Sequence, residues 1–110
     1  MKQVYLSITP GGHDIDHKEW NTSLYQIMDE LLENDIKKFK AHLEMGDEDE
    51  KRIPGGALEK ADKVMLVKLL LKYFGVNDSV TKTRDALKFI PRNDLKKYLK
   101  PFLSKLGETW

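Results

Sequence analysis

Two linked stretches decide the fold of this chain: Ile36-Lys37-Lys38-Phe39-Lys40-Ala41-His42-Leu43, and Arg52-Ile53-Pro54-Gly55-Gly56-Ala57-Leu58-Glu59-Lys60-Ala61-Asp62. In the first, Ile36, Phe39 and Leu43 recur at the spacing of one helix face, so they predict an amphipathic helix that buries this face. The lysines between them project around the remaining surface as a basic patch. The second stretch is a breaker-rich connection that ends in a carboxylate, just before a very apolar segment. Basic residues in one stretch and acidic residues in another, without a catalytic site, favour a domain that binds other domains of the same type.

The composition fits a single domain. At 110 residues the chain is long enough to bury a modest core. It has no cysteine, which excludes disulfides and thiolate metal sites and favours a reducing intracellular setting. No apolar run approaches the roughly 18 residues that a membrane span needs. The N-terminus also lacks the basic-then-apolar layout of a signal peptide. We therefore expect a soluble cytoplasmic domain.

The N-terminal part of the chain differs from the rest. Residues 1–21 begin with an alternating apolar pattern, break at Pro10-Gly11-Gly12 and continue as a polar run that ends in Trp20. They predict a flexible extension, from which Trp20 or the alternating segment rests on the domain. We expect the folded domain over residues 22–106, followed by a tail or the start of a linker at 107–110.

The chain from Asn21 onward predicts helices. Ser23, with Gln26 three residues later, is a capping-box signal for the first helix. This helix is expected to bury Leu24, Ile27 or Met28, Leu31 and Leu32. A second helix, capped by Asn34, carries the buried face described above. A charged loop ending at Pro54 then precedes a short third helix.

The second half of the chain predicts three more helices. Asp62 caps a fourth that is apolar around most of its circumference and should therefore be central. Gly75 is expected to stop it in the left-handed conformation. Asp78 begins a fifth helix and Asn93 caps a sixth, which Pro101 should kink or end. Phe39, Phe74, Tyr98 and Phe102 are expected in the core. Together these assignments predict an all-α fold, a six-helix antiparallel bundle with a short third helix.

Residues 23 to 106 resemble a pyrin domain of the death-fold superfamily. The segments that carry the resemblance are the leucine-rich first helix, Ile36-Lys37-Lys38-Phe39-Lys40, Arg52-Ile53-Pro54, Leu58-Glu59-Lys60-Ala61-Asp62, Leu66 through Gly75, and Arg92-Asn93-Asp94-Leu95. The long loop before a short third helix also suits this family. The resemblance implies a six-helix bundle without catalysis. It also implies homotypic binding to other pyrin domains, either those of a speck-forming adaptor or copies of itself, and helical filaments in inflammasome signalling.

The resemblance also implies which residues make the contacts. In pyrin domains, acids on the first and fourth helices meet bases on the second and third helices of a neighbour. The matching positions here are Asp29, Glu30 and Asp62 on the acidic side, and Lys37, Lys38, Lys40, His42 and Arg52 on the basic side. When two different patches on one domain are complementary, each domain binds the next head to tail. If the rotation between neighbouring domains does not close a ring, the product is an open filament. Each exposed pair contributes about 0.2–1 kcal/mol, so assembly needs several weak, salt-sensitive contacts.

Two departures from the family pattern reduce the charge of the basic patch and of the acidic patch. Gly55 stands where many relatives place an arginine. Met65 and Lys68 stand where the best-known polymerising adaptor has acids. These differences favour a domain that binds an adaptor over one that polymerises readily alone.

The role of the chain stays open at this stage. It is either the recruitment domain of an innate immune sensor or adaptor, or a pyrin-only decoy that caps and inhibits such assemblies. A different class, a nucleic-acid-binding helical domain, is suggested by Lys37, Lys38, Lys40, Lys96, Lys97 and Lys100. The formal net charge is only +1, however, and such modules usually show a clear basic excess.

Chemistry of other kinds is not expected. No serine is placed as a nucleophile, and Gly55-Gly56 lacks the lysine of a phosphate loop. The cluster of His13, Asp14, Asp16 and His17 has the right atoms for a metal but a poor helical context and no further ligand. We expect no enzyme, cofactor, metal or membrane partner.

Overall fold

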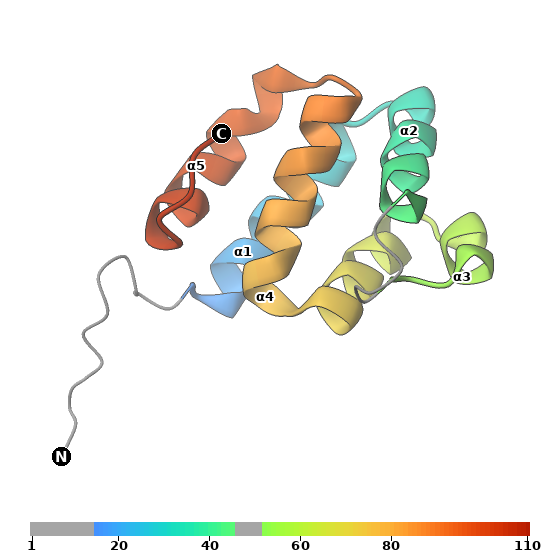
Figure 1. Ribbon diagram of the computed structural model, residues 1–110, viewed down its shortest axis with the longest axis horizontal. Coiled ribbons are helices and arrows are strands. Elements are labelled where there is room, and N and C mark those ends of the chain that lie inside the picture. Colours follow the sequence, from blue (N-terminus) through green and yellow to red (C-terminus); the bar gives the residue numbers. More distant parts are fainter. Residues whose placement is uncertain (1–14, 46–51) are drawn as a thin grey trace, which may run out of the picture.

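The computed structural model describes residues 15–45 and 52–110, and these form helices around one apolar core (Figure 1). In chain order the elements are α1 (His17–Glu30), α2 (Glu33–Glu44), α3 (Gly55–Lys60), α4 (Lys63–Phe89), the 3-10 turn η1 (Asn93–Leu95) and α5 (Lys96–Lys105). The described residues contain no strand. The alternating pattern and the breaker predicted near the N-terminus lie outside the described residues. The all-α prediction and the short third helix are confirmed.

The central helix is α4, which packs against α1, α2 and α5 (Figure 1). Its 27 residues are interrupted at Gly75, where φ is 77° and ψ is 177°. The predicted break at Gly75 is thus confirmed, but the conformation is not the left-handed helical one. This combination of angles is open essentially to glycine alone. The two halves of α4 take the places of the predicted fourth and fifth helices.

The core contains a tryptophan whose polar edge is satisfied. The Trp20 ring is fully buried and packs edge-on against Phe102, with the ring centroids 5.1 Å apart. Its indole N–H donates to the Ser79 hydroxyl at 2.8 Å, and this hydroxyl donates to the Val76 carbonyl at 2.7 Å. A buried indole needs such a partner. The side chain therefore joins α1 to the second half of α4 and to α5.

The first helix begins earlier than predicted. Asp16, not Ser23, is its N-cap, and the Asp16 carboxylate accepts the backbone N–H groups of Lys18 and Glu19. The predicted capping box is therefore wrong, because Ser23 lies inside the helix. Burial of Trp20 stabilises the additional turns, since an aromatic side chain of this size removes much apolar surface from water.

The corner between α1 and α2 also differs from the prediction. Helix α1 ends at Glu30, so Leu31 takes the buried position and Leu32 is 70% exposed. Asn34 does not cap α2, which begins at Glu33 after Leu32. Instead, the Asp35 carboxylate accepts the Leu32 backbone N–H at 3.0 Å. This reversed form of capping satisfies one of the groups that every helix start leaves unpaired.

Two helix starts predicted in the second half of the chain are wrong. Asp78 is a helical residue within the second half of α4, and Asn93 is the first residue of η1 and makes no capping hydrogen bond. Helix α5 continues through Pro101 to Lys105, so the proline does not end it. Phe39 and Phe102 are buried as predicted, whereas Phe74 and Tyr98 are only half-buried because they lie at the rim of the core.

The last four residues fold back along α4. Gly107, with φ of 70°, ends α5 in a Schellman motif, in which the Glu108 N–H donates to the Leu103 carbonyl at 2.9 Å. Arg84 then donates to the Glu108 carboxylate at 2.8 Å and to the Thr109 carbonyl at 2.9 Å. The segment predicted as a tail is thus held against α4.

Within the part of the chain that the structure describes, no helix combines the length and apolar character needed to cross a membrane.

Candidate interaction surfaces

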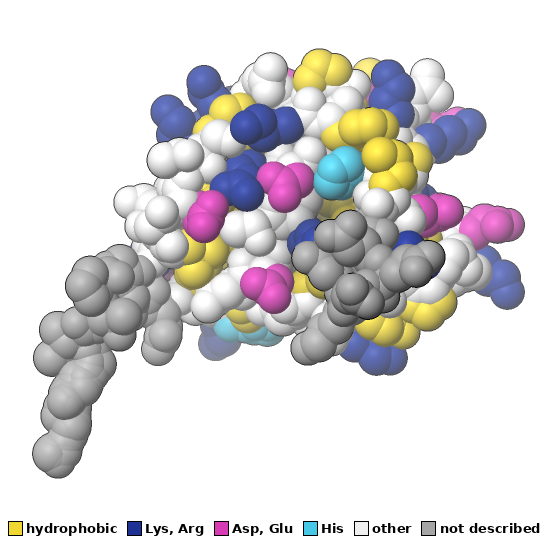
Figure 2. All heavy atoms as spheres, viewed as in Figure 1, with side chains coloured by type: hydrophobic (Ala, Val, Ile, Leu, Met, Phe, Trp, Pro, Cys, Tyr) yellow, Lys and Arg dark blue, Asp and Glu magenta, His cyan; other side chains and the backbone are white. Residues whose placement is uncertain are grey.

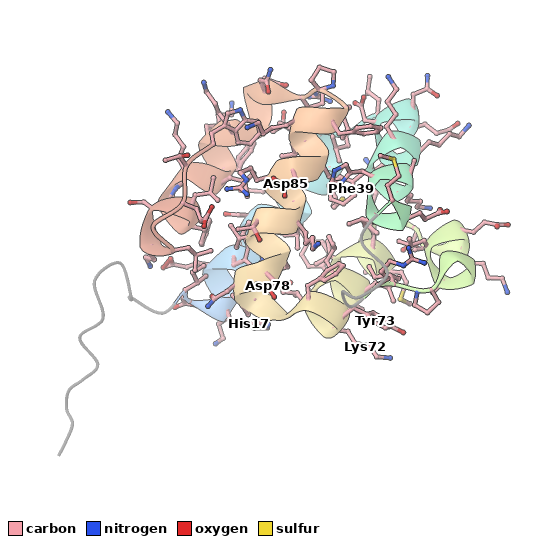
Figure 3. All side chains as sticks on the ribbon, viewed as in Figure 1. His17, Phe39, Lys72, Tyr73, Asp78 and Asp85 are labelled. Carbon is pink, nitrogen blue, oxygen red and sulfur yellow. The ribbon has the colours of Figure 1, made fainter. Side chains whose placement is uncertain are left out.

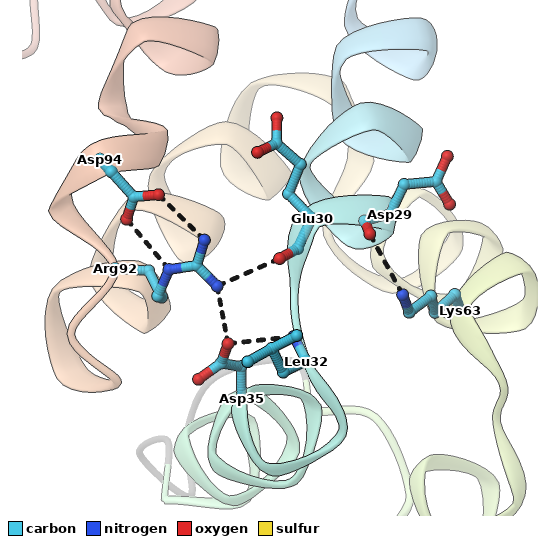
Figure 4. A network of polar contacts seen from close by, with 7 residues as sticks. All are labelled: Asp29, Glu30, Leu32, Asp35, Lys63, Arg92 and Asp94. Carbon is cyan, nitrogen blue, oxygen red and sulfur yellow. Dashed lines mark hydrogen bonds and ion pairs between the residues drawn. The ribbon is translucent and has the colours of Figure 1, made fainter.

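The acidic surface forms where the end of α1 meets the start of α4. Asp29 is exposed in the last turn of α1, and Asp62 is the exposed N-cap of α4. One Asp62 carboxylate oxygen accepts the Met65 N–H at 2.8 Å. Lys63 joins the two helices, because its ammonium group lies 3.4 Å from the Asp29 carbonyl oxygen (Figure 4). The residue that follows Asp62 therefore contacts the residue Asp29 on α1.

The position of Asp29 is not what helix stability alone would favour. The C-terminal end of a helix carries partial negative charge, so an acid there costs a few tenths of a kcal/mol and a base is preferred. The last turn of α1 nevertheless contains Asp29 and Glu30 and no basic residue. This arrangement supports a role for the acids outside the helix itself.

Glu30 is exposed but engaged within the protein. Its carboxylate accepts the hydroxyl hydrogen of Tyr98 on α5, and this hydrogen bond raises the pKa of Tyr98. Its backbone carbonyl accepts a hydrogen bond from Arg92 at 3.1 Å. Of the predicted acids, Glu30 is therefore the one most restricted by its own neighbours.

Arg92 organises the corner next to these acids (Figure 4). Its guanidinium group donates to both carboxylate oxygens of Asp94, at 3.0 and 2.9 Å, and to Asp35 at 2.7 Å. The pKa of Asp35 is lowered, first by the N–H of Leu32 and then by Arg92. The hydrogen bond from Arg92 also lowers the pKa of Asp94. The sequence did not indicate this role of Arg92, because Glu30 and Asp35 are brought near it only by the tertiary fold.

The basic surface lies on α2 and just beyond its end. Lys37 and Lys38 are exposed to solvent. Arg52 is exposed as well, and its guanidinium nitrogen lies 3.5 Å from the Glu44 carbonyl oxygen at the end of α2. All three side chains are thus exposed to solvent.

Two other predicted bases are turned toward the protein. Lys40 is half-buried and its ammonium group donates to the Ala61 carbonyl at 2.7 Å. His42 is half-buried against Phe89, with ring centroids 5.2 Å apart. Burial lowers the pKa of His42 below its ordinary value of 6.5, although Asp85 opposes this shift. The lowered pKa favours the neutral imidazole at pH 7.

An apolar groove adjoins Asp62. It has a volume of about 400 Å³ and is lined by Ala57, Lys60, Asp62, Val64, Met65 and Leu69. Val64 and Met65 are 49% and 46% exposed. An exposed acid beside exposed apolar side chains is typical of a protein-binding surface, where a central apolar contact is surrounded by polar groups.

A more polar hollow of about 450 Å³ lies on the second half of α4. Its lining residues are Phe74, Asp78, Thr81, Lys82, Arg84, Asp85 and Glu108. Asp78 and Asp85 both belong to this half of α4, on the face toward the viewer in Figure 3. Acidic and basic side chains are interspersed on this face (Figure 2). Arg84 is itself paired with Asp85 and Glu108, so this hollow presents little unpaired charge of one sign.

The predicted metal-like cluster is only partly described. Asp16 caps α1 and His17 is its exposed first residue, whereas His13 and Asp14 lie outside the described residues. Among residues 15–45 and 52–110, no three His, Cys, Asp or Glu side chains are grouped as a metal site would require.

Comparison with known proteins relates the amino-acid sequence to a family. The PAAD/DAPIN/Pyrin domain family matches residues 23–108. Among curated proteins, the chain is 34% identical over 87 residues to NACHT, LRR and PYD domains-containing protein 6 of the mouse, Mus musculus. The aligned region is 78% of this chain, but the chain spans only 10% of the length of that relative. No solved structure matches the chain.

Proposed function

Since the chain belongs to the pyrin-domain family of the death-fold superfamily, we propose that it recruits the pyrin domain of a speck-forming adaptor by homotypic contact in the cytoplasm. Pyrin domains are protein-interaction modules and not enzymes. The relative named for NACHT, LRR and PYD domains supports a place in inflammasome-type signalling. Recruitment of an adaptor is the finer step that this proposal adds.

One observation carries the proposal: exposed charges of opposite sign lie on different helices. Asp29 and Asp62 are displayed at the junction of α1 with α4, and Lys37 and Lys38 on α2. Two distinct complementary surfaces allow each domain to contact one neighbour through its acids and another through its bases. Repetition of this contact gives a helical assembly.

We propose a smaller set of contact residues. Asp29 and Asp62, with the apolar groove beside Asp62, form the acidic surface, and Lys37, Lys38 and Arg52 form the basic one. Glu30 and His42 take a smaller direct part, because Glu30 is bonded to Tyr98 and His42 is half-buried. Lys40 makes no direct contact, because its ammonium group is bonded to the Ala61 carbonyl. Met65 stands at a position where the best-known polymerising adaptor has an acid. Its apolar side chain beside Asp62 offsets the loss of that charge, since it offers a contact that salt does not screen.

The alternative function is that of a decoy that caps adaptor filaments. It is favoured by the reduced charge of both surfaces. Gly55 is exposed at the start of α3 with open space around it, and exposed Met65 and Lys68 thin the acidic surface. A domain that binds well through only one surface would join a filament end and stop its growth.

A seeding assay distinguishes the two functions. The 110-residue chain is added at substoichiometric amounts to a soluble adaptor pyrin domain, and filament growth is followed by light scattering and electron microscopy. Faster growth supports recruitment, and slower growth supports the decoy. Asp62→Lys should remove either effect, whereas the matched control Asp78→Lys, on the other half of α4, should retain it. If the unmodified chain leaves growth unchanged, both functions are wrong.

A further inference from the structure

Lys40 stands apart from the other lysines of α2. Whereas Lys37 and Lys38 are exposed, Lys40 is half-buried and its ammonium group donates to the Ala61 carbonyl at 2.7 Å. Ala61 is the buried C-cap of α3, and the next residue is Asp62. A cation on the basic helix is therefore bonded to the backbone immediately before the acidic contact.

We propose that Lys40 is a positioning residue, which holds the Ala61–Asp62 link so that the Asp62 carboxylate is presented to a partner. This inference rests on the proposed function, in which Asp62 is a contact residue. Lys40 itself does not contact the partner. The basic helix of one domain thus supports the acidic surface of the same domain.

The link needs external support because α3 is a weak element. The helix has only six residues and begins with Gly55 and Gly56. So short a helix is marginal by itself, and glycine lowers its stability further. The N-cap of α3, Pro54, makes no side-chain capping hydrogen bond. Its fixed points are therefore tertiary: the fully buried Leu58 and the bond from Lys40 to the Ala61 carbonyl.

A second, weaker tie lies on the other side of Asp62. Lys63 approaches the Asp29 carbonyl at 3.4 Å, which is long for a hydrogen bond (Figure 4). The Lys40 bond, at 2.7 Å and half-buried, is the stronger of the two. Between them, the Asp62 carboxylate accepts the Met65 N–H at 2.8 Å. Movement of the link would therefore first disturb this cap.

Amide hydrogen exchange of the unbound chain tests the first half of the inference. In Lys40→Met the apolar stem is retained and the bond to Ala61 is lost, so the Met65 amide should exchange several-fold faster. The control Lys38→Met removes an exposed cation from the same helix and should leave that rate unchanged. Equal Met65 exchange in Lys40→Met and in the unmodified chain would overturn the positioning role. If Lys40→Met fails to fold, Lys40→Gln provides the same comparison.

A double-mutant cycle in adaptor binding tests the second half. Lys40→Met alone should weaken binding several-fold. In an Asp62→Asn background, which keeps a capping side chain but removes the charge, Lys40→Met should have little further effect. Equal losses in both backgrounds would overturn the positioning role, because a direct contact or a purely structural residue behaves in that way. If the unmodified chain does not bind the adaptor at all, the proposed function fails. The exchange result on the unbound chain still decides whether Lys40 positions Asp62.

Discussion

Phe39 shows how one residue of the opening sequence motif determines stability. Its ring is completely buried on α2, at the position that the helical spacing of Ile36, Phe39 and Leu43 predicted. Phe39→Ala should lower the free energy of unfolding by about 3–5 kcal/mol, because a cavity replaces the ring. The same substitution at Phe89, which is 45% exposed, should cost much less. Urea unfolding measures both, and equal losses would contradict the core assignment.

The Arg92 network makes a prediction about pH. Asp35 has a folded-state pKa below its ordinary value of 3.8, first because of the Leu32 N–H and then because of Arg92. A lowered pKa contributes stability that is present above the unfolded-state value, near pH 4, and is lost as pH falls through the folded-state value. Urea midpoints should therefore drop below about pH 4. Arg92→Met should make this drop smaller. If the urea midpoint of Arg92→Met falls with pH as steeply as that of the unmodified chain, the network does not have this role.

At single residues, the sequence predicts which apolar side chains are buried better than it predicts where a polar side chain points. Phe39 and Leu43 were assigned correctly because helical spacing alone places them on the buried face. The inward course of Lys40 was missed because its acceptor, the Ala61 carbonyl, is brought near only by the tertiary fold. The same reason explains His42, whose pKa is lowered by burial and by the charge of Lys82, and whose ring packs against Phe89.

At the scale of elements, glycines at two positions have opposite effects. Gly75 interrupts α4 with φ of 77°, and a side chain there is strained even though the space is open. Gly75→Ala should therefore cost about 1–3 kcal/mol. Gly56 lies in α3 with open space around it and no positive φ, so Gly56→Ala should stabilise by about 0.5–1 kcal/mol. Thermal unfolding that shifts in the same direction for both variants would contradict this account.

Helix boundaries were the least predictable elements. The start of α1 was missed because His17, Lys18 and Glu19 are polar, although Trp20 continues the buried spacing of Leu24, Ile27 and Leu31. That spacing was the available signal, and it was outweighed by a capping-box pattern that occurs inside the helix. The order of helices, the short third helix and the break at Gly75 followed from apolar periodicity and breaker residues. These signals act locally and need no tertiary information.

At the scale of the whole molecule, the chain presents acids at the junction of α1 and α4 and bases along α2. Asp62→Lys should abolish binding to an adaptor pyrin domain in a pull-down, because it reverses the charge at the centre of the acidic surface. The lost cap costs about 0.5–2 kcal/mol, less than the total stability of a typical domain. A circular-dichroism melt of the variant separates loss of contact from unfolding. Unchanged binding by the folded variant would remove Asp62 from the interface.

The most direct test of the central claim is a charge-reversal rescue. The Asp62→Lys chain is combined with an adaptor pyrin domain whose basic surface has been changed to acids, and binding is measured for all four pairings of original and reversed partners. We expect the two mixed pairings to fail and the doubly reversed pairing to recover binding. If both reversed proteins are folded and binding does not recover, complementary charge between these two surfaces is not what joins the domains.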